Sequence, residues 1–399
     1  MATPPNEAEA TRLLRKALAE SLAAEAVLPD AGWRSAVEKV PRHAFVPGFY
    51  LPADQLDENG LMVWEPVTAE LDHARWLHAA YSDTTLITQF DGDEPDWKQP
   101  ATRNGGTPTS SSTLPSLVMR MWADADVQDG HTVLEIGTGT GYSTALVCER
   151  LGSTAVTSIE VDSQRLDQAA AALYECGYTP TLAVADGLYG YWPEAPVDRI
   201  VGACSFRAVP PALVAQARPG GKILLTLSGW LYGYARVLLT VTDQHTAEGP
   251  LLPGTISFMA ARTHAAPAFG NPAHWAADLP ERSRAARHNP ERITEPTEQA
   301  FHLRFLAQCA VPNSQMTGVG DVLHLVDVVT GSAATLTPAG GSWQVREGGP
   351  IKLWERVEAV LDAYDTAGQP APETFCLQVT GEHQRLRHPQ MPDLPLPRP

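Results

Sequence analysis

The segment from Glu135 to Tyr142 reads EIGTGTGY and carries three glycines at alternate positions directly after a short apolar run. Glycines at a strand-to-helix turn leave bare backbone that a nucleotide-like ligand can approach closely. A dinucleotide fingerprint G-x-G-x-x-G would need its third glycine where Tyr142 stands, which argues against NAD and FAD. The G-x-G-x-G spacing therefore favours S-adenosylmethionine as the cofactor. The predicted contacts in this turn are Glu135, Gly137, Thr138, Gly139, Gly141 and Tyr142.

Carboxylates follow the next two apolar runs at the same relative place. Glu160 ends one run about 20 residues after the glycines, where a carboxylate can accept hydrogen bonds from both ribose hydroxyls. Asp186 ends the following run, where a carboxylate can accept from the adenine amine. With their neighbours Val161 and Gly187, these two residues complete the predicted cofactor site.

Alternating strands and helices are needed to bring these residues together. Short apolar runs and helical patterns alternate between positions 132 and 241, which predicts repeated βαβ units in a Rossmann-like α/β fold with a doubly wound, mostly parallel sheet. The carboxyl ends of parallel strands share one edge, where open α/β folds bind ligands. The predicted strands are Thr132–Ile136, Ala155–Glu160, Thr181–Ala185, Arg199–Ala203, Lys222–Leu227 and Tyr234–Val241, and the predicted helices are Tyr142–Leu151, Leu166–Cys176 and Pro211–Ala217.

The regions on both sides of this core have other patterns. Apolar residues recur at helical spacing from Glu7 to Ala26, whereas the stretch from Asp91 to Thr113 is rich in Gly, Pro, Asn, Ser and Thr and predicts a polar loop. After a stretch without clear periodicity, helical and strand patterns predict an additional C-terminal α+β domain. We expect five segments: an N-terminal helical and substrate-loop region (1–114), the S-adenosylmethionine-binding core (115–263), a linker (264–297), a C-terminal substrate-recognition domain (298–388) and a proline-rich extended tail (389–399).

The composition excludes several classes of protein. The 399 residues include 46 acidic and 29 basic side chains, and a net charge of -17 repels a phosphate backbone, so nucleic acid is disfavoured as a partner. No signal sequence opens the chain and no apolar stretch approaches the ~20 residues that span a bilayer, which predicts a cytoplasmic protein without a membrane partner. The five cysteines are far apart without a C-x-x-C pair, which predicts reduced thiols and no metal site. The oligomeric state stays open.

Five segments of the chain have the order and spacing of a known family. They read VPRHAFVP, VLEIGTGTGYSTALV, SIEVD, ADGLYGYWPEAPVDRIVGA and VPPALVAQARPGGKILL. Through them, the residues from Val40 to Val241 resemble the protein L-isoaspartate O-methyltransferase family. The resemblance implies a Rossmann-like core that transfers the methyl group of S-adenosylmethionine to a side-chain carboxylate.

The resemblance also points to a catalytic hydroxyl. The family pattern has a Ser followed two residues later by Pro, and Thr113 and Pro115 stand at the matching places, with Ser112 and Ser111 as adjacent alternatives. A carboxylate is already ionised near neutral pH and needs no strong general base, so an oriented hydroxyl can hold it in line with the methyl group. The structural alternative for Thr113 is to cap the helix that begins near Pro115.

Four further residues are candidates for substrate binding. Tyr81 and Asp83 lie in a segment that resembles the family's substrate-side loop, and Arg42 and His43 could contact a carboxylate or the peptide backbone. For each of the four, packing and hydrogen bonding within loops is the alternative.

The residues after Val241 lie beyond the compact repair enzymes of the family. This layout resembles the methyltransferases of ribosomal peptide maturation, including graspetide and lanthipeptide systems. The leading hypothesis is methylation of an Asp in a macrocyclic precursor peptide, whose ester then collapses to an aspartimide. One alternative is repair of isoaspartyl residues in damaged proteins. Another is a non-catalytic binding module that retains the cofactor fold, which the complete cofactor motifs disfavour.

Overall fold

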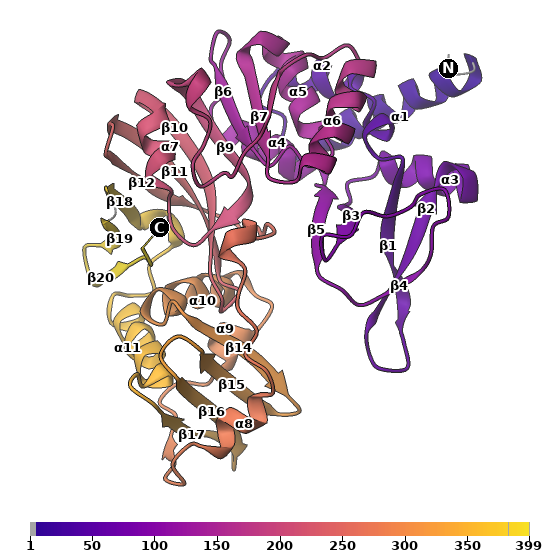
Figure 1. The fold of residues 1–399 in the computed structure, drawn as a ribbon. Coiled ribbons are helices and arrows are strands. Elements are labelled where there is room, and N and C mark those ends of the chain that lie inside the picture. The colour runs from indigo at the N-terminus through magenta and orange to yellow at the C-terminus, as the bar shows by residue number, and fades with distance from the viewer. Residues whose placement is uncertain (1–4, 382, 399) are drawn as a thin grey trace. The chain divides into compact units, whose positions relative to one another are not determined.

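The computed structural model describes residues 5–381 and 383–398. The chain divides into two compact units, of which the first ends at Ala203 and the second begins at Cys204. In Figure 1 the first unit runs from indigo to magenta and the second from pink to yellow. Each unit is described by itself.

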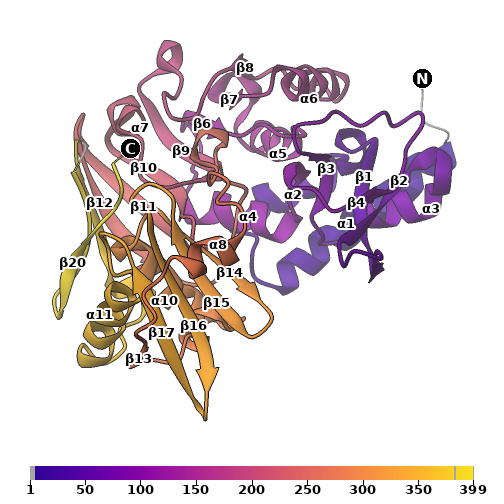
Figure 2. The same ribbon diagram turned by 60° about the horizontal axis from the view of Figure 1, so that its bottom comes forward.

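The first unit contains the parallel sheet that the βαβ pattern predicts. Its strands are β6 (Val133–Ile136), β7 (Val156–Glu160), β8 (Thr181–Val184) and β9 (Val197–Phe206). They lie in the order β9-β6-β7-β8, and each neighbouring pair is parallel (Figure 2). The strand order therefore reverses between β6 and β9, and in doubly wound folds the ligand binds at that reversal, outside the carboxyl ends of the strands.

Polar side chains cap three of the helices in the first unit. The helices are α1 (Pro5–Ala24), α2 (Ala31–Lys39), α3 (Ala69–Ala80), α4 (Pro115–Asp124), α5 (Tyr142–Leu151) and α6 (Ser163–Glu175), with short 3-10 helices η1 (Arg42–Phe45), η2 (Ser153–Ala155) and η3 (Trp192–Glu194). Asp30, Thr68 and Asp162 accept hydrogen bonds from the first backbone N–H groups of α2, α3 and α6. α5 begins instead at Gly141, whose φ of 90° favours glycine.

A small antiparallel sheet in the first unit was not predicted. It contains β1 (Gly48–Leu56), β2 (Met62–Thr68), β3 (Leu86–Phe90), β4 (Arg103–Asn104) and β5 (Pro108–Ser112), in the order β4-β2-β1-β3-β5. The stretch from Asp91 to Thr113, expected to be a polar loop, thus holds two strands. β5 is a strand because it pairs with the fully buried β3, with Leu86 opposite Ser112. Its own residues lack the apolar alternation that would have predicted it.

The second unit contains an antiparallel sheet of six strands. They are β10 (Ala217–Ser228), β11 (Tyr234–Asp243), β12 (Thr246–Leu252), β18 (Cys376–Thr380), β19 (His383–His388) and β20 (Met391–Pro395). The order is β20-β19-β18-β12-β11-β10, with Glu248 of β12 opposite Gln378 of β18. Strands far apart in the chain therefore form one sheet, and α7 (Pro211–Gln216) packs against β10.

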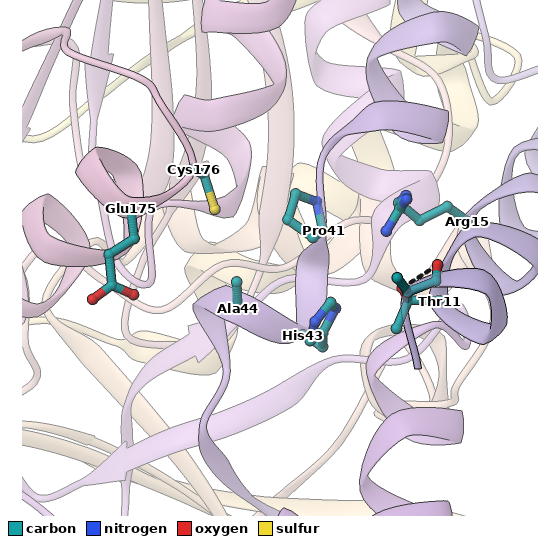
Figure 3. A pocket seen from close by; sticks show the side chains of 8 residues that line it. Thr11, Arg15, Pro41, His43, Ala44, Glu175 and Cys176 are labelled. Carbon is teal, nitrogen blue, oxygen red and sulfur yellow. Dashed lines mark hydrogen bonds between the residues drawn. The ribbon is translucent and has the colours of Figure 1, made fainter. Parts of the chain in front are cut away.

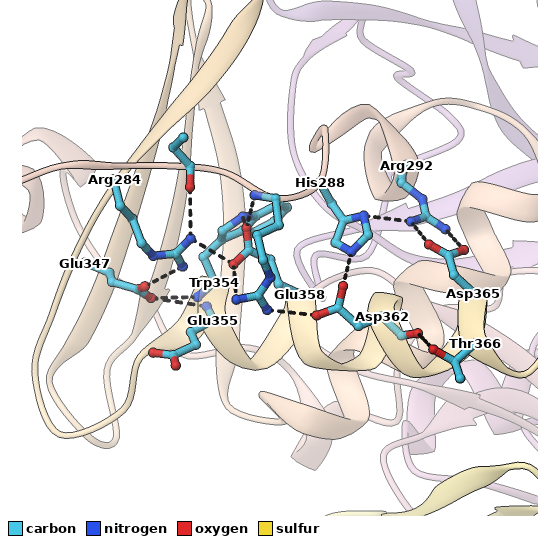
Figure 4. Close-up of polar contacts among 12 residues, drawn as sticks. Arg284, His288, Arg292, Glu347, Trp354, Glu355, Glu358, Asp362, Asp365 and Thr366 are labelled. Atoms are coloured by element: carbon cyan, nitrogen blue, oxygen red, sulfur yellow. Dashed lines mark hydrogen bonds and ion pairs between the residues drawn. The ribbon is translucent and has the colours of Figure 1, made fainter.

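A second sheet lies in the same unit. Its strands are β13 (Arg284–Ala285), β14 (Ser314–Val319), β15 (Val322–Asp327), β16 (Ser332–Ala339) and β17 (Ser342–Gly348), in the order β13-β17-β16-β15-β14. The remaining helices are α8 (Pro272–Ala277), α9 (Glu291–Thr294), α10 (Glu298–Ala310), α11 (Leu353–Thr366), η4 (Arg262–His264) and η5 (Pro372–Thr374). Figure 4 shows ion pairs between the segment around β13 and α9 and the acidic side chains of β17 and α11. Among them, Arg284 Nη1 lies 2.8 Å from Glu358 Oε2, and Arg292 Nη2 lies 2.7 Å from Asp365 Oδ1.

The α/β fold class and the additional C-terminal α+β region are confirmed, but the expected segment boundaries differ from the structure. The core expected at 115–263 is divided within β9. The linker expected at 264–297 includes α8, β13 and α9, and the expected tail contains β20, in which Met391 and Leu394 are buried. These differences arise because segments far apart in the chain pair in the sheets, and local sequence patterns do not reveal such pairing. Within the described residues, no helix is both long enough and apolar enough to cross a membrane.

Candidate active site

The glycine-rich turn joins β6 to α5 at the carboxyl edge of the parallel sheet. Gly137, Gly139 and Gly141 have φ angles of 96°, 55° and 90°, which residues with side chains rarely adopt. A Cβ on Gly139 would lie 3.5 Å from the carbonyl oxygen of Ser111, and one on Gly141 would lie 3.2 Å from the Cβ of Ala169. The glycines therefore form a backbone cradle that side chains would partly fill.

Three residues predicted to contact the cofactor have buried side chains. Glu135 Oε2 accepts hydrogen bonds from Thr144 Oγ1 at 2.5 Å and from Ser158 Oγ at 2.8 Å, and burial raises the pKa of the Glu135 carboxyl. Thr138 Oγ1 lies 2.8 Å from the same Ser158 hydroxyl, and Tyr142 is buried as well. The side chains of Glu135, Thr138 and Tyr142 thus support the turn from within. Their contact with the cofactor stays a prediction, and it concerns their backbone atoms and not these side chains.

Glu160 at the end of β7 faces the turn. Its Oε2 accepts from Gly139 N at 3.0 Å, and its Oε1 accepts from Val161 N at 2.9 Å and Asp162 N at 3.1 Å. Backbone N–H groups therefore orient both oxygens. Oε1 already accepts from two of them, whereas Oε2 accepts from one and can also accept from a ribose hydroxyl. The Val161 side chain is 43% exposed and provides apolar surface beside this carboxylate.

Asp186 stands at the end of β8, next to Gly187. Its Oδ1 accepts from Leu188 N at 2.9 Å, which fixes the carboxylate in the loop that follows the strand. Ala185 N donates to Glu160 O at 3.0 Å, so the ends of β7 and β8 are joined. The glycine cradle and the two carboxylates together fit the adenosine of S-adenosylmethionine.

Neighbouring hydroxyls at the end of β5 face opposite ways. Ser112 is buried and its Oγ accepts from Arg42 Nε at 3.3 Å, whereas Ser111 and Thr113 are partly exposed on the other face. Thr113 does not cap α4, because Asp83 Oδ1 accepts from Ser116 N at 2.8 Å instead. The Thr113 hydroxyl has no hydrogen-bond partner among the residues that the structure describes.

Arg42 is fully buried, and its hydrogen bonds hold together the segments around the Thr113 hydroxyl. Its guanidinium donates to the carbonyl oxygens of Ser112 and Thr113, both at 3.1 Å, and to three further carbonyls in the α3–β3 connection. The three are those of Ala80 at 3.3 Å, Ser82 at 3.0 Å and Thr84 at 2.9 Å. Burial lowers the pKa of Arg42 to about 10, which still leaves it charged at neutral pH. Arg42 therefore positions the end of β5 and does not present its charge to a substrate.

His43 and Tyr81, which were predicted separately as candidates for substrate binding, are in contact with each other. His43 Nδ1 lies 2.5 Å from the Tyr81 hydroxyl, and both side chains are largely buried. Burial lowers the pKa of His43 to about 4 and raises that of Tyr81 to about 12, so both are neutral at pH 7. His43 lines a separate cavity, which is described below.

Gln89 is a buried residue that the sequence did not single out. Its Nε2 donates to Asp162 Oδ2 at 3.2 Å, and its Oε1 accepts from Thr109 Oγ1 at 2.8 Å. It thus ties β5 to the N-terminus of α6, close to Glu160. No local pattern could have revealed it, because its partners lie 20 and 73 residues away in the chain.

The chain is similar to known proteins of one family. The family description "Protein-L-isoaspartate(D-aspartate) O-methyltransferase (PCMT)" matches residues 73–231. Over 213 residues, the chain is 30% identical to the protein-L-isoaspartate O-methyltransferase of Thermococcus onnurineus. The alignment covers 53% of this chain and 76% of the relative. The chain is also 30% identical to the enzyme of that name from Ignicoccus hospitalis, with 53% of this chain and 80% of the relative covered.

A solved structure is similar in fold to this chain, and the similarity extends beyond residues 73–231. It is titled protein-L-isoaspartate O-methyltransferase, and it superposes with a TM-score of 0.52 over 94% of this chain and 99% of its own. At 17% sequence identity this match concerns the fold alone. Residues 242–399, expected to set the chain apart from compact members, are thus largely matched in a protein with the same title.

Proposed function

The chain belongs to the protein-L-isoaspartate O-methyltransferase family, whose members are S-adenosylmethionine-dependent methyltransferases, and on this premise we propose that it esterifies the free carboxylate of an isoaspartyl residue in a protein or peptide. The observation that carries the proposal is the partly exposed hydroxyl of Thr113 at the end of β5. It has no hydrogen-bond partner within the described part of the chain. The carbonyl of Ser111, two residues earlier, lies beside the glycine cradle.

Methyl transfer to a carboxylate requires little of the protein beyond positioning of the two reactants. S-adenosylmethionine supplies an electrophilic methyl group on a sulfonium sulfur, and the new carboxylate O–C bond forms as the S–C bond breaks. The negative charge of the carboxylate and the positive charge of the sulfonium disappear together, so no proton is transferred. The carboxylate is already ionised near neutral pH. Rate enhancement therefore depends on alignment and on exclusion of water.

Three groups of this chain would provide the alignment. The Thr113 hydroxyl donates to one carboxylate oxygen of the substrate and leaves the other free to attack. Glu160, held by three backbone N–H groups, accepts from a ribose hydroxyl through Oε2. Arg42 holds the carbonyls of Ser112 and Thr113 and so fixes the position of the hydroxyl.

A pair of matched peptides tests the substrate. One peptide contains an isoaspartyl residue and the other an ordinary Asp at the same position, and each is incubated with enzyme and S-adenosylmethionine. We expect the methyl ester, followed by mass, to form only on the isoaspartyl peptide. Equal turnover of the two peptides would contradict the proposal.

A second candidate is methylation of an ordinary Asp in a macrocyclic precursor peptide, followed by closure of the ester to an aspartimide. It is favoured by the Ser- and Thr-rich strand β5, because the resemblance to the family implies a glycine-rich stretch before the catalytic hydroxyl and this chain has Ser and Thr there. The C-terminal residues alone do not favour it, because the solved structure above matches most of them. Incubation of a precursor peptide would then yield a methyl ester followed by net loss of water, with little turnover of the isoaspartyl peptide.

A further inference from the structure

A cavity of about 560 Å³ lies in the first unit, between α1, η1 and the end of α6 (Figure 3). Its lining includes Arg15 from α1, His43 from η1 and Glu175 from the last turn of α6. None of the residues assigned to the cofactor lines it, and neither does Thr113.

The end of the cavity that α6 forms is distant from the cofactor edge of the sheet. α6 begins at Ser163, directly after the loop that follows β7, and its 13 residues end at Glu175. At 1.5 Å per residue the helix carries Glu175 roughly 20 Å from its N-terminus near Glu160. The lining residues from α6 therefore lie toward the opposite edge of the sheet, and a ligand here would occupy a second site.

Two hydrogen-bond donors face this cavity. Arg15 Nε donates to Glu38 O at 2.8 Å, which anchors the guanidinium, and Figure 3 shows its end turned toward Pro41 across the cavity. His43 is neutral at pH 7, because burial lowers its pKa to about 4. Its Nδ1 lies 2.5 Å from the Tyr81 hydroxyl, and in the tautomer in which that hydroxyl donates to Nδ1, the His43 hydrogen is on Nε2 and is a second donor.

The other lining residues limit the charge and character of a ligand. Arg15 is the cation of the lining and Glu175 is a carboxylate on the opposite side of the cavity (Figure 3), so a dianion would meet repulsion that a monoanion with its charge at Arg15 would largely avoid. Pro41 and Ala44 add short apolar surfaces. A single carboxylate on a small apolar body matches this combination of groups.

We propose that this cavity is a binding site for a small monocarboxylate, held by the Arg15 guanidinium and the Nε2 hydrogen of His43. It is distinct from the methyl-transfer site and does not depend on which peptide is methylated. The bidentate geometry of a guanidinium with a carboxylate provides most of the recognition.

Calorimetry on the full chain saturated with S-adenosylhomocysteine tests the site, with benzoate as the probe. We expect benzoate to bind one-to-one, and Arg15→Gln to weaken binding about tenfold or more, because a charge-assisted bidentate contact is lost. Arg34→Gln is the matched control, since Arg34 pairs with Glu38 at 3.0 Å but does not line the cavity. It should bind benzoate like the unchanged protein.

Glu175→Gln provides a test that leaves Arg15 in place. Removing this carboxylate should change benzoate binding little, because a monoanion with its charge at Arg15 largely avoids the repulsion, but it should tighten binding of the dianion phenylphosphonate. Uncharged benzamide should bind far more weakly than benzoate. The proposal fails if benzoate does not bind, if Arg15→Gln binds it normally, or if benzamide binds as tightly as benzoate. Preference for phenylphosphonate over benzoate would also overturn it, in favour of a phosphate-like ligand.

Discussion

At the scale of single residues, the direction of each side chain separates residues that the sequence places together. Ser112 and Thr113 are adjacent, yet the first hydroxyl binds the buried Arg42 and the second is partly exposed. Glu135 and Glu160 both follow apolar runs, yet the first supports the turn from within and the second faces it. These differences lead to distinct predictions for each residue.

Thr113→Ala should lower kcat/KM by about 10- to 100-fold, because one hydrogen bond to a charged carboxylate is lost. Thr113→Ser should keep much of the activity. Calorimetry should give an unchanged affinity of Thr113→Ala for S-adenosylhomocysteine, since the hydroxyl does not touch the cofactor. Ser112→Ala is the control, and its main effect should be on stability, because Ser112 Oγ accepts from Arg42. A parallel loss of cofactor binding in Thr113→Ala would assign Thr113 a structural role.

Glu135→Gln should remove a pH dependence of stability. The folded-state pKa of Glu135 is raised above its ordinary value of 4.5, so above pH 4.5 the folded state retains a proton that the unfolded state has lost. The free energy of unfolding therefore falls as the pH rises from 4.5 through the folded-state pKa, and the glutamine variant lacks this contribution.

Urea denaturation at several pH values between 4.5 and 8 measures the effect. Glu58→Gln, at an exposed position, should keep the slope of the unchanged protein. Identical slopes for Glu135→Gln and the unchanged protein would show that Glu135 does not titrate differently in the folded state.

At the scale of elements, ion pairs hold the segment with β13 and α9 against α11. Glu358 is fully buried, accepts from Trp354 Nε1 at 3.0 Å and Arg287 N at 2.7 Å, and pairs with Arg284 (Figure 4). Glu358 is thus the central acceptor of this contact. A neutral side chain there would leave buried donors without a charged partner.

Glu358→Gln should lower the free energy of unfolding by about 1–3 kcal/mol, because a buried charged hydrogen bond is weakened. Glu355→Gln on the exposed face of the same helix should change it by less than about 0.5 kcal/mol. Urea denaturation of both variants makes the comparison. Equal stability of the two variants would mean that the ion pairs do not hold the segment.

The sequence predicted the elements that local patterns define and missed those that distant partners define. The helix predicted at Tyr142–Leu151 matches α5, because its apolar spacing and the preceding glycine are local signals. β5 was missed because the buried β3 makes it a strand. In the candidate site, the glycines and Glu160 could be identified from spacing. The inward direction of Glu135 could not, since it depends on hydroxyls of α5 and β7 that fold beneath it.

At the scale of the whole molecule, the last residues of the chain complete a sheet. β20 pairs with β19, and its Met391 and Leu394 are buried in the second unit. Removal of residues 389–399 should lower the melting temperature of the second unit, because these apolar side chains lose their burial and β19 becomes an edge strand. Differential scanning calorimetry compares the truncated and complete chains. Unchanged melting would indicate that β20 adds nothing to the stability of the sheet.

The pairing of β12 with β18 joins two strands that the ribosome makes at different times. β12 ends at Leu252 and its partner β18 begins at Cys376. At a synthesis rate of about 5–20 residues per second, β12 is therefore complete about 6–25 s before synthesis of β18 begins. Throughout this time the outer edge of β12 is a row of unpaired N–H and C=O groups, a template for pairing with the wrong strand. Nascent chains of this protein should therefore engage holding chaperones soon after residue 252 leaves the ribosome, and release them only when the last strands arrive.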